Sequence, residues 1–302
     1  MRAITCTKYG PPEVLELREI DKPVPKENEL LIRIRATTVT SGDVRIRSFT
    51  FPLLLKPLVG LMFGFRRPRN PVLGHEFAGE VESAGKGVKR FKKGAQVFGS
   101  TGLGSGTYAD YICLAEDGPI ATKPSTMTNE QAAAVPVGGL TALFFLRKGR
   151  VRAGQRILIH GASGSVGMFA LQIAKSLGAD VTGVCSTKNL DLVKSLGADR
   201  VIDYLKTDPR EKGILYDVIF DAVGKTSEKY FRQSLSPGGT FVTVAGRTDR
   251  QEADDLVFLA ELIEAGKLKS VIDRTYPFEQ IREAHRYVEG GHKTGNVVIT
   301  VA

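Results

Sequence analysis

A glycine-rich run, Gly161-Ala162-Ser163-Gly164-Ser165-Val166-Gly167, separates two segments with different hydrophobic patterns. Residues 156–160 form a short apolar stretch typical of a buried strand, and residues 165–177 have helical periodicity. The apolar residues of this second segment that share one helical face are Val166, Ala170, Ile173 and Leu177. A second strand pattern follows at 181–185, and strand, helix and strand in this order predict a βαβ unit with parallel strands.

The same alternation continues on both sides of this unit. We expect helices over residues 129–148, 190–196, 227–235 and 254–265, and strands over 200–202, 217–220 and 240–244. Thr128 or Asn129 can cap the first of these helices. The pattern predicts an α/β fold with a doubly wound, Rossmann-type parallel sheet.

The first part of the chain has a different texture. Residues 30–35 alternate apolar and charged side chains, and brief apolar runs at 77–81 and 96–98 lie between glycine-containing turns. This predicts a small, mainly-β region, with a domain boundary near residues 122–128. A chain of 302 residues, 42% hydrophobic and 25% charged, is long enough for two such folded domains.

Composition also narrows the partners and the compartment. The 42 lysines and arginines exceed the 33 acidic residues and give a net charge of +9, but they are scattered, so no specific nucleic acid is expected. Cys6, Cys113 and Cys185 are far apart in sequence, which favours a reducing compartment. The opening residues have no signal-peptide pattern, so we expect a cytoplasmic protein.

Residues 49–65 are strongly apolar, and Arg66, Arg67 and Arg69 follow at once. Pro52, Lys56 and Pro57 interrupt the run, which is shorter than the ~20 residues that span a bilayer, so no transmembrane helix is expected. Two interpretations stay open. A flap over a substrate cleft is favoured, and a weak contact with a membrane surface is the alternative.

The position of the glycine run between a strand and a helix indicates its chemistry. Gly164 lets the backbone approach a pyrophosphate, Gly167 lets helix and strand pack closely, and the helix N-terminus supplies N–H donors. We therefore predict a dinucleotide site with these members: Ser163, Gly164, Ser165, Val166 and Gly167.

The end of the second strand indicates which dinucleotide is bound. An NAD site places a carboxylate there for the ribose 2′-hydroxyl, but this chain has Cys185, Ser186, Thr187 and Lys188. A cation without a carboxylate favours a 2′-phosphate, so we predict NADPH bound by Ser186 and Lys188. A solvent-exposed Lys188 without this role is the alternative.

Five segments together resemble the medium-chain dehydrogenase/reductase superfamily, and most of all its zinc-independent quinone oxidoreductase branch. They are GPPEVLELREIDKP at 10–23, GHEFAGEVESAGKGVKRFKKGAQVFG at 74–99, AAAVPVGGLTA at 132–142, the glycine run, and YDVIFDAVG at 216–224. The resemblance implies a GroES-like catalytic domain, residues 1–124 and 267–302, around a Rossmann domain, residues 125–266. It further implies an NADPH-dependent oxidoreductase that passes hydride to quinones or other activated carbonyl or enone acceptors.

The resemblance also assigns further cofactor residues. Tyr204 would reach the 2′-phosphate, and Thr141 would lie near the nicotinamide. The residues expected to line its ring and ribose are Val223, Gly224, Val244, Gly246 and Asn296.

Zinc-dependent relatives bind the metal through a cysteine, the histidine of Gly-His-Glu and a third ligand. Here Gly74-His75-Glu76 is kept, but Thr40 and Val137 stand at the other two positions, so no metal ligand is predicted. We expect three catalytic residues: Thr40 as an oxyanion donor, Asp43 near the cleft and His75 as a proton donor. A turn-capping Asp43 and a structural His75 remain alternatives.

After Gly246 the chain passes through RTDRQEA directly into a helix, whereas family members have some tens of residues there, including the strand that pairs two subunits. This puts the usual dimer in question. Two further functions stay open: an enoyl-thioester reductase of the same superfamily, and a low-activity, cofactor-dependent protein that binds RNA or a membrane.

Overall fold

The computed structural model describes residues 1–53, 56–102, 104–210, 213–245 and 251–301. The chain forms two compact units. The first comprises Met1–Pro136, Gln251–Ala260 and Ile272–Ala302, and the second comprises Val137–Arg250 and Glu261–Val271. The sequence analysis drew the boundaries at 124/125 and 266/267. The helix α3 (Asn129–Ala133) falls in the first unit because it packs on two strands of that unit, β3 (Glu29–Thr38) and β4 (Glu76–Ala84).

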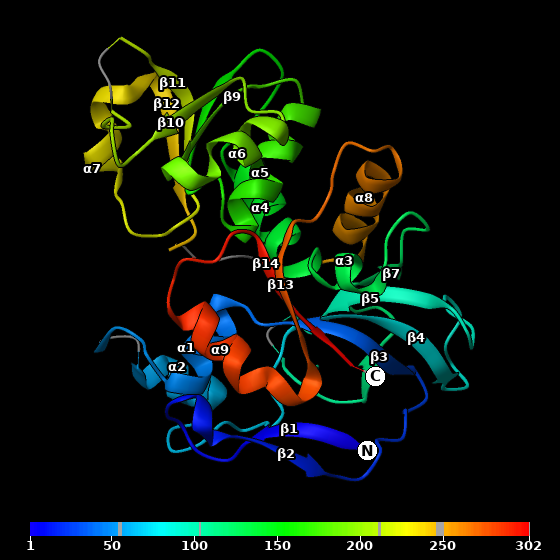
Figure 1. Ribbon diagram of the computed structural model, residues 1–302. Helices are drawn as coiled ribbons and strands as arrows, with labels where there is room; N and C mark the ends of the chain where they lie inside the picture. Colours follow the sequence, from blue (N-terminus) through cyan, green and yellow to red (C-terminus); the bar gives the residue numbers. More distant parts are fainter. Residues whose placement is uncertain (54–55, 103, 211–212, 246–250, 302) are drawn as a thin grey trace. The chain divides into compact units, whose positions relative to one another are not determined.

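The second unit contains five parallel strands in the order β10-β9-β8-β11-β12. Figure 1 labels β9, β10, β11 and β12 of this sheet. Their bounds are β8 (Arg156–His160), β9 (Asp180–Cys185), β10 (Arg200–Asp203), β11 (Tyr216–Asp221) and β12 (Leu235–Thr243). The chain starts in the middle of the sheet, winds to one edge and then to the other. This order confirms the predicted doubly wound Rossmann-type fold, in which ligands bind beyond the carboxyl ends of the central strands.

Helices cover this sheet. They are α4 (Pro136–Lys148), α5 (Ser165–Ser176), α6 (Leu190–Ser195) and α7 (Glu228–Phe231), and α8 (Ala253–Glu264) contributes residues to both units. The helix α5 packs on β8 and β9, and α6 packs on β9 and β10. Of the four residues expected on the buried face of α5, Leu177 is 37% exposed, because the helix ends one residue before it.

The single helix predicted over residues 129–148 is wrong, because the segment forms two helices, α3 and α4. Thr128 caps α3 through a capping box with Gln131. The break falls before Pro136, whose ring disfavours helical geometry at the preceding residue and which has no N–H to donate to an earlier carbonyl.

The first unit is mainly β, as predicted. A two-stranded sheet pairs β1 (Arg2–Cys6) with β2 (Leu15–Glu19). A larger sheet has the order β13-β14-β3-β4-β5-β7, with β6 also paired to β3. The remaining bounds are β5 (Gln96–Ser100), β6 (Tyr111–Ala115), β7 (Ile120–Thr122), β13 (Ile272–Pro277) and β14 (Asn296–Thr300). Three further helices belong to this unit: α1 (Ser41–Ser48), α2 (Lys56–Phe63) and α9 (Ile281–Glu289).

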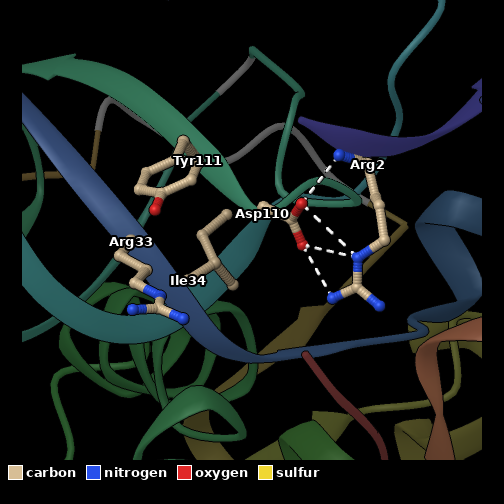
Figure 2. A pocket seen from close by; sticks show the side chains of 5 residues that line it. All are labelled: Arg2, Arg33, Ile34, Asp110 and Tyr111. Carbon is tan, nitrogen blue, oxygen red and sulfur yellow. Dashed lines mark hydrogen bonds and ion pairs between the residues drawn. The ribbon is translucent and has the colours of Figure 1, made fainter. Parts of the chain in front are cut away.

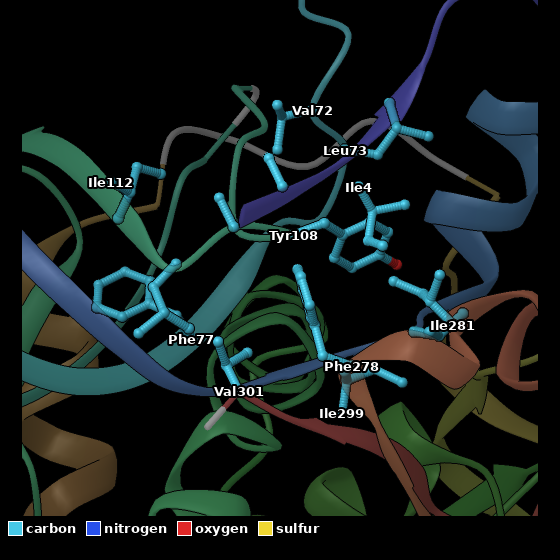
Figure 3. Packing of buried hydrophobic residues seen from close by; sticks show 14 of the residues in the cluster. Ile4, Val72, Leu73, Phe77, Tyr108, Ile112, Phe278, Ile281, Ile299 and Val301 are labelled. Atoms are coloured by element: carbon cyan, nitrogen blue, oxygen red, sulfur yellow. The ribbon is translucent and has the colours of Figure 1, made fainter. Parts of the chain in front are cut away.

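Distant parts of the sequence build the core of the first unit (Figure 3). Ile4 of β1, Phe77 of β4 and Ile299 of β14 are all at most 2% exposed and belong to one apolar cluster. Burying a large apolar side chain stabilises a fold by about 1.5–3 kcal/mol relative to exposing it. Both ends of the described chain therefore contribute to the stability of this unit.

A small surface pocket of the first unit is lined by Arg2, Arg33, Ile34, Asp110 and Tyr111 (Figure 2). The Arg2 guanidinium donates to Asp110 at 2.9 Å and to Glu279 at 3.1 Å, which ties β1 to the segment before β6 and to the 3-10 turn before α9. None of the predicted site residues lines this pocket. No helix in the described part of the chain is both long and apolar enough to cross a membrane.

Candidate functional site

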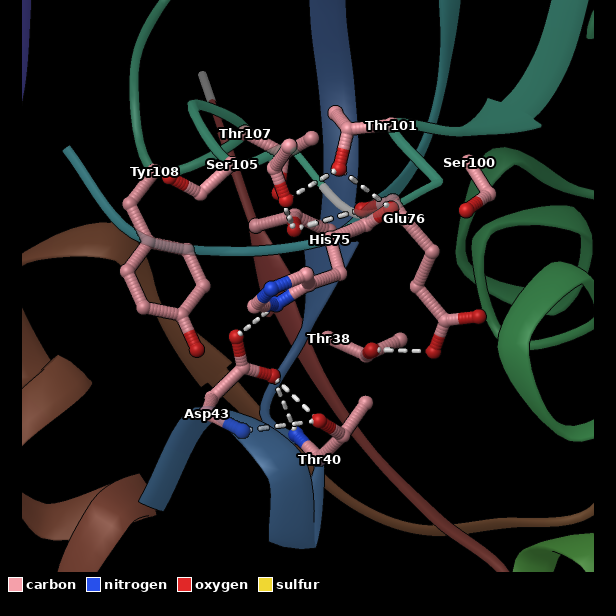
Figure 4. Close-up of polar contacts among 12 residues, drawn as sticks. Thr38, Thr40, Asp43, His75, Glu76, Ser100, Thr101, Ser105, Thr107 and Tyr108 are labelled. Carbon is pink, nitrogen blue, oxygen red and sulfur yellow. Dashed lines mark hydrogen bonds and ion pairs between the residues drawn. The ribbon is translucent and has the colours of Figure 1, made fainter. Parts of the chain in front are cut away.

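The three predicted catalytic residues lie together in the first unit (Figure 4). Thr40 is the N-cap of α1, and its hydroxyl accepts the Asp43 N–H at 3.1 Å while the Asp43 carboxylate accepts the Thr40 N–H at 2.8 Å. This capping box holds Asp43 at the start of the helix. From there Oδ1 of Asp43 lies 2.6 Å from Nδ1 of His75, which precedes β4.

The same geometry changes the role expected for Thr40. Its hydroxyl donates to Oδ2 of Asp43 at 2.5 Å, and a hydroxyl has one proton to give. Thr40 therefore orients Asp43 and does not donate to a substrate oxygen in this arrangement. Asp43 caps the helix, as the alternative in the sequence analysis expected, and it is also the partner of His75.

Charge and burial reinforce the pairing of Asp43 with His75. The Asp43 side chain is fully buried and that of His75 is 12% exposed. Burial raises the pKa of Asp43, but His75 and the Thr40 hydrogen bonds outweigh it and lower that pKa. Burial lowers the pKa of His75, but the Asp43 carboxylate outweighs it and raises that pKa above the ordinary value. The pair therefore favours a protonated imidazole beside an ionised carboxylate.

The backbone at His75 is held in place by its neighbours. Gly74 has a φ of +88°, and a Cβ there would lie 2.3 Å from the Thr107 hydroxyl and 2.5 Å from the Tyr108 ring. Only glycine fits this turn. The His75 carbonyl accepts the Thr101 N–H at 2.8 Å, so the residue is held on both sides.

Further polar groups, which sequence reasoning missed, lie near this pair, and Figure 4 shows Glu76 and Tyr108 among them. Glu76 is 1% exposed and accepts the Thr38 hydroxyl. The Tyr108 hydroxyl lies 3.2 Å from Nε2 of His285, and burial lowers the pKa of this histidine to about 3, so it is neutral at pH 7. Burial also lowers the pKa of Lys293 to about 8, although Glu76 and Asp273 raise it.

The predicted phosphate loop lies between β8 and α5 in the second unit. Gly164 is the N-cap of α5, and no side chain caps the helix. The first N–H groups of a helix have no partner within it, so this end can receive an anion. A Cβ on Gly164 would meet only the Gly161 carbonyl at 3.5 Å, whereas one on Gly167 would lie 2.1 Å from that oxygen. Gly164 is therefore open to a ligand, and Gly167 serves close packing.

Three of the other predicted members of the loop are accessible. Ser163, Ser165 and Val166 are partly exposed, while Gly167 is buried. These features fit a dinucleotide pyrophosphate, since the loop offers backbone donors, open space and a positive helix end.

A second structured turn follows β11. Asp221 is fully buried, and its Oδ1 accepts the N–H groups of Val223 at 3.0 Å and Gly224 at 3.1 Å. Its Oδ2 accepts the Thr226 N–H at 2.9 Å. His160, at the end of β8, contacts the same carboxylate. Neither Asp221 nor His160 was predicted as a site residue. The sequence did hold a signal for both, because His160 is the last residue of one expected strand, Asp221 directly follows another, and a glycine-containing turn comes after each.

The cofactor residues implied by the resemblance have the following positions. Val223 is 38% exposed, and Val244 follows β12, where its N–H donates to the Asp221 carbonyl. Thr141 is partly buried on α4, and Asn296 is the first residue of β14 in the first unit. Gly246 lies outside the described residues.

The residues predicted to select the cofactor lie where β9 and β10 end. Ser186 and Lys188 follow β9, and the Tyr204 N–H donates to the Cys185 carbonyl at 3.1 Å, which brings the segment after β10 alongside. Lys188 is exposed and Tyr204 is 51% exposed.

Asp203 is the residue that the sequence analysis overlooked here. It ends β10 opposite Cys185, so a carboxylate does lie near this edge. The Asp203 carboxylate accepts the Thr187 hydroxyl at 2.5 Å and lies 3.9 Å from the Lys206 ammonium. The Asp203 carboxylate therefore already has partners within the protein.

Metal-ligating side chains do not gather in the part of the chain that the structure describes: no group of three or more His, Cys, Asp and Glu could hold an ion there. Cys6, Cys113 and Cys185 are free thiols, and burial raises the pKa of each to about 11. Thr40, one of the positions that a zinc-dependent relative would use, is occupied by its hydrogen bonds with Asp43.

Comparisons with known proteins place these two units in one family. Residues 26–125 match the alcohol dehydrogenase GroES-like domain, and residues 165–286 match the zinc-binding dehydrogenase family. The chain belongs to the medium-chain dehydrogenase/reductase superfamily. It is an oxidoreductase of that family with a nicotinamide cofactor.

Three relatives illustrate the match. Human quinone oxidoreductase is 32% identical over 336 aligned positions, which cover 99% of this chain and 97% of that protein. The NADPH-dependent alkenal/one oxidoreductase, chloroplastic, of Arabidopsis thaliana is 32% identical over 99% of this chain and 79% of that protein. The solved structure of the quinone oxidoreductase from Coxiella burnetii superposes with a TM-score of 0.83 at 28% identity, covering 100% and 99% of the two chains.

Proposed function

We propose that this chain is a zinc-independent, NADPH-dependent reductase of quinones or other activated carbonyl and enone acceptors. The 2.6 Å contact between Asp43 and His75 carries the proposal. Asp43 uses Nδ1 and stabilises the protonated ring, so Nε2 keeps a proton for a substrate. The names of the quinone oxidoreductase and alkenal/one oxidoreductase relatives support this acceptor class.

Bound NADPH would supply a hydride to the electrophilic carbon of the acceptor. The chain then has to neutralise the acceptor oxygen, which gains negative charge as the carbon is reduced. In this proposal the Nε2–H of His75 donates the proton to that oxygen, and the Asp43 carboxylate steadies the ring before and after the transfer. Hydride and proton together complete a two-electron reduction.

The choice of NADPH depends on the ends of β9 and β10. Ser186, Lys188 and Tyr204 would hold the 2′-phosphate, and the Asp203 carboxylate is bound by Thr187. The glycine run and the N-terminus of α5 would hold the pyrophosphate. The other two ligand positions support the absence of zinc. The Thr40 hydroxyl is hydrogen-bonded to Asp43, and the Val137 side chain has no atom that can bind a metal.

The test is cofactor oxidation measured against a panel of quinones, α,β-unsaturated carbonyls and simple ketones. We expect turnover of the activated acceptors with NADPH and little with unactivated ketones, with no added metal. Turnover of none of them would reject the reductase and favour a low-activity cofactor-binding protein. Preference for enoyl thioesters would shift the assignment to the other reductase class.

A further inference from the structure

The helix α2 of the first unit turns apolar side chains toward solvent. Leu58, Leu61 and Met62 follow the i, i+3, i+4 spacing of one helical face and Phe65 lies two residues past the end of the helix, and the four are 58%, 60%, 42% and 63% exposed. We define them as the apolar stripe. In a soluble protein such a helical face normally packs against the core, so its exposure indicates a surface that binds a partner.

The opposite side of the segment anchors it to the unit. Phe63 packs against the core of the first unit, and the Tyr9 hydroxyl lies 3.2 Å from the Phe63 carbonyl and 2.8 Å from the Gly64 carbonyl. Tyr9 in turn stacks on Phe49, with ring centroids 4.5 Å apart. These contacts hold the C-terminal end of α2 so that the apolar stripe stays outward.

Basic side chains border the apolar stripe. Arg66, Arg67 and Arg69 directly follow it and are all exposed, and Lys56 at the start of α2 is exposed as well. None of the three arginines forms an ion pair with another residue that the structure describes. An exposed apolar face bordered by unpaired cations complements an anionic lipid surface, where apolar groups enter the acyl boundary and cations meet phosphates.

We propose that the apolar stripe and Arg66, Arg67 and Arg69 dock the first unit onto an anionic phospholipid bilayer. An eight-residue helix rises about 12 Å, less than half the ~30 Å hydrocarbon thickness, so α2 would lie within the interface. The proposal selects the membrane interpretation of residues 49–65, because exposure, anchoring and the basic border all belong to described residues of one segment. It does not depend on the proposed reductase activity.

The test is sedimentation of the full-length protein with vesicles of phosphatidylcholine alone and of phosphatidylcholine mixed with phosphatidylserine. We expect binding to the anionic vesicles that weakens with salt. Replacing Arg66, Arg67 and Arg69 together by Gln should reduce the partition coefficient roughly a hundredfold, since each basic residue near such a surface contributes about fivefold. Leu58→Gln with Leu61→Gln should reduce it at least tenfold.

Matched controls are available on the same unit. The control for the arginine variant replaces three exposed cations by Gln: Lys86, Lys92 and Lys93. The control for the leucine variant replaces two exposed apolar residues by Gln: Leu17 and Val24. These controls should bind like the parent, and thermal midpoints confirm that all variants are folded.

Three results would overturn the proposal. The first is a parent protein that binds no anionic vesicles. The second is equal loss of binding in the α2 variants and their matched controls. The third is a dimer in light scattering that Leu58→Gln with Leu61→Gln converts to monomer, since a second copy would then cover the apolar stripe.

Discussion

Nδ1 of His160 lies 3.2 Å from Oδ1 of Asp221, and these two residues stand opposite each other at the ends of the parallel strands β8 and β11. The same Asp221 carboxylate holds the N–H groups of Val223, Gly224 and Thr226. One buried side chain thus joins the residue before the glycine run to the turn after β11. Asp221 is a positioning residue for both segments.

Replacing Asp221 by Asn should lower the free energy of unfolding by about 1.5–3 kcal/mol, because an amide cannot accept the same set of N–H bonds with a full charge. NADPH and NADH should both bind more weakly, since the turn and not the 2′-phosphate site is disturbed. Denaturant unfolding and calorimetric titration measure the two effects. Asp217→Asn on the same strand is the matched control, and equal losses in both variants would contradict this role.

The stability difference should also depend on pH. Burial raises the pKa of Asp221, but the hydrogen bonds from His160 and Thr226 outweigh it and hold that pKa well below the ordinary value. A depressed carboxyl pKa stabilises the fold above about pH 4, and this contribution is lost as the pH falls. The difference in free energy of unfolding between the parent and Asp221→Asn should therefore become smaller in acid. A difference that does not change with pH would contradict this prediction.

Lys188→Ala should weaken NADPH binding roughly ten- to a hundredfold, because a charge-assisted hydrogen bond contributes about 1.5–3 kcal/mol. NADH lacks the 2′-phosphate and should bind almost unchanged. Titration of both cofactors into parent and variant gives the four dissociation constants. Lys194→Ala, on the neighbouring helix α6, should affect neither. Equal losses for both cofactors, or a parent that binds NADH as tightly as NADPH, would remove the basis for the NADPH assignment.

The reductase rate should fall as pH rises through the pKa of His75, since only the protonated ring donates. The Asp43 carboxylate raises that pKa despite burial, so the midpoint of kcat/KM should lie above the ordinary value of about 6.5. Asp43→Asn removes the charge and should move the midpoint to lower pH. His75→Gln should lower kcat/KM by about 10²–10⁴ at neutral pH. An unchanged midpoint in Asp43→Asn would exclude the proposed stabilisation of the protonated His75 ring by Asp43.

Purified protein should contain no stoichiometric zinc and should keep its activity in chelators. The reason is the ligand set: of the three expected positions, His75 alone carries a metal-binding donor, and a tetrahedral zinc site needs three or four protein ligands. Elemental analysis and activity after dialysis against chelator provide the measurement. One tightly bound zinc per chain would overturn the zinc-free assignment.

The sequence predicted the central strands of the parallel sheet well because they are short apolar runs. The strand β12 begins five residues before the one expected at 240–244 and includes the polar stretch Ser236-Pro237-Gly238. The strand expected at 156–160 has the same bounds as β8. Long-range partners could not be predicted in this way. Asp43 and His75 are 32 positions apart, and Tyr108 and His285 are 177 apart, so only the fold brings each pair together. Asp203 was overlooked for a related reason, since its place beside Cys185 depends on strand order.

The strand β14 has a consequence for how the molecule is made. It lies inside the larger sheet of the first unit, between β3 and β13, and pairs with residues about 260 positions earlier, such as Val298 with Thr38. During synthesis, β4 and β6 can pair with β3 early, but Ala36, Thr37 and Thr38 of β3 lack their β14 partners until the parallel sheet of the second unit has been made. Unpaired edges invite aggregation and such distant pairings form slowly. The Ala36–Thr38 end of β3 therefore stays open to wrong pairing until β14 has been made.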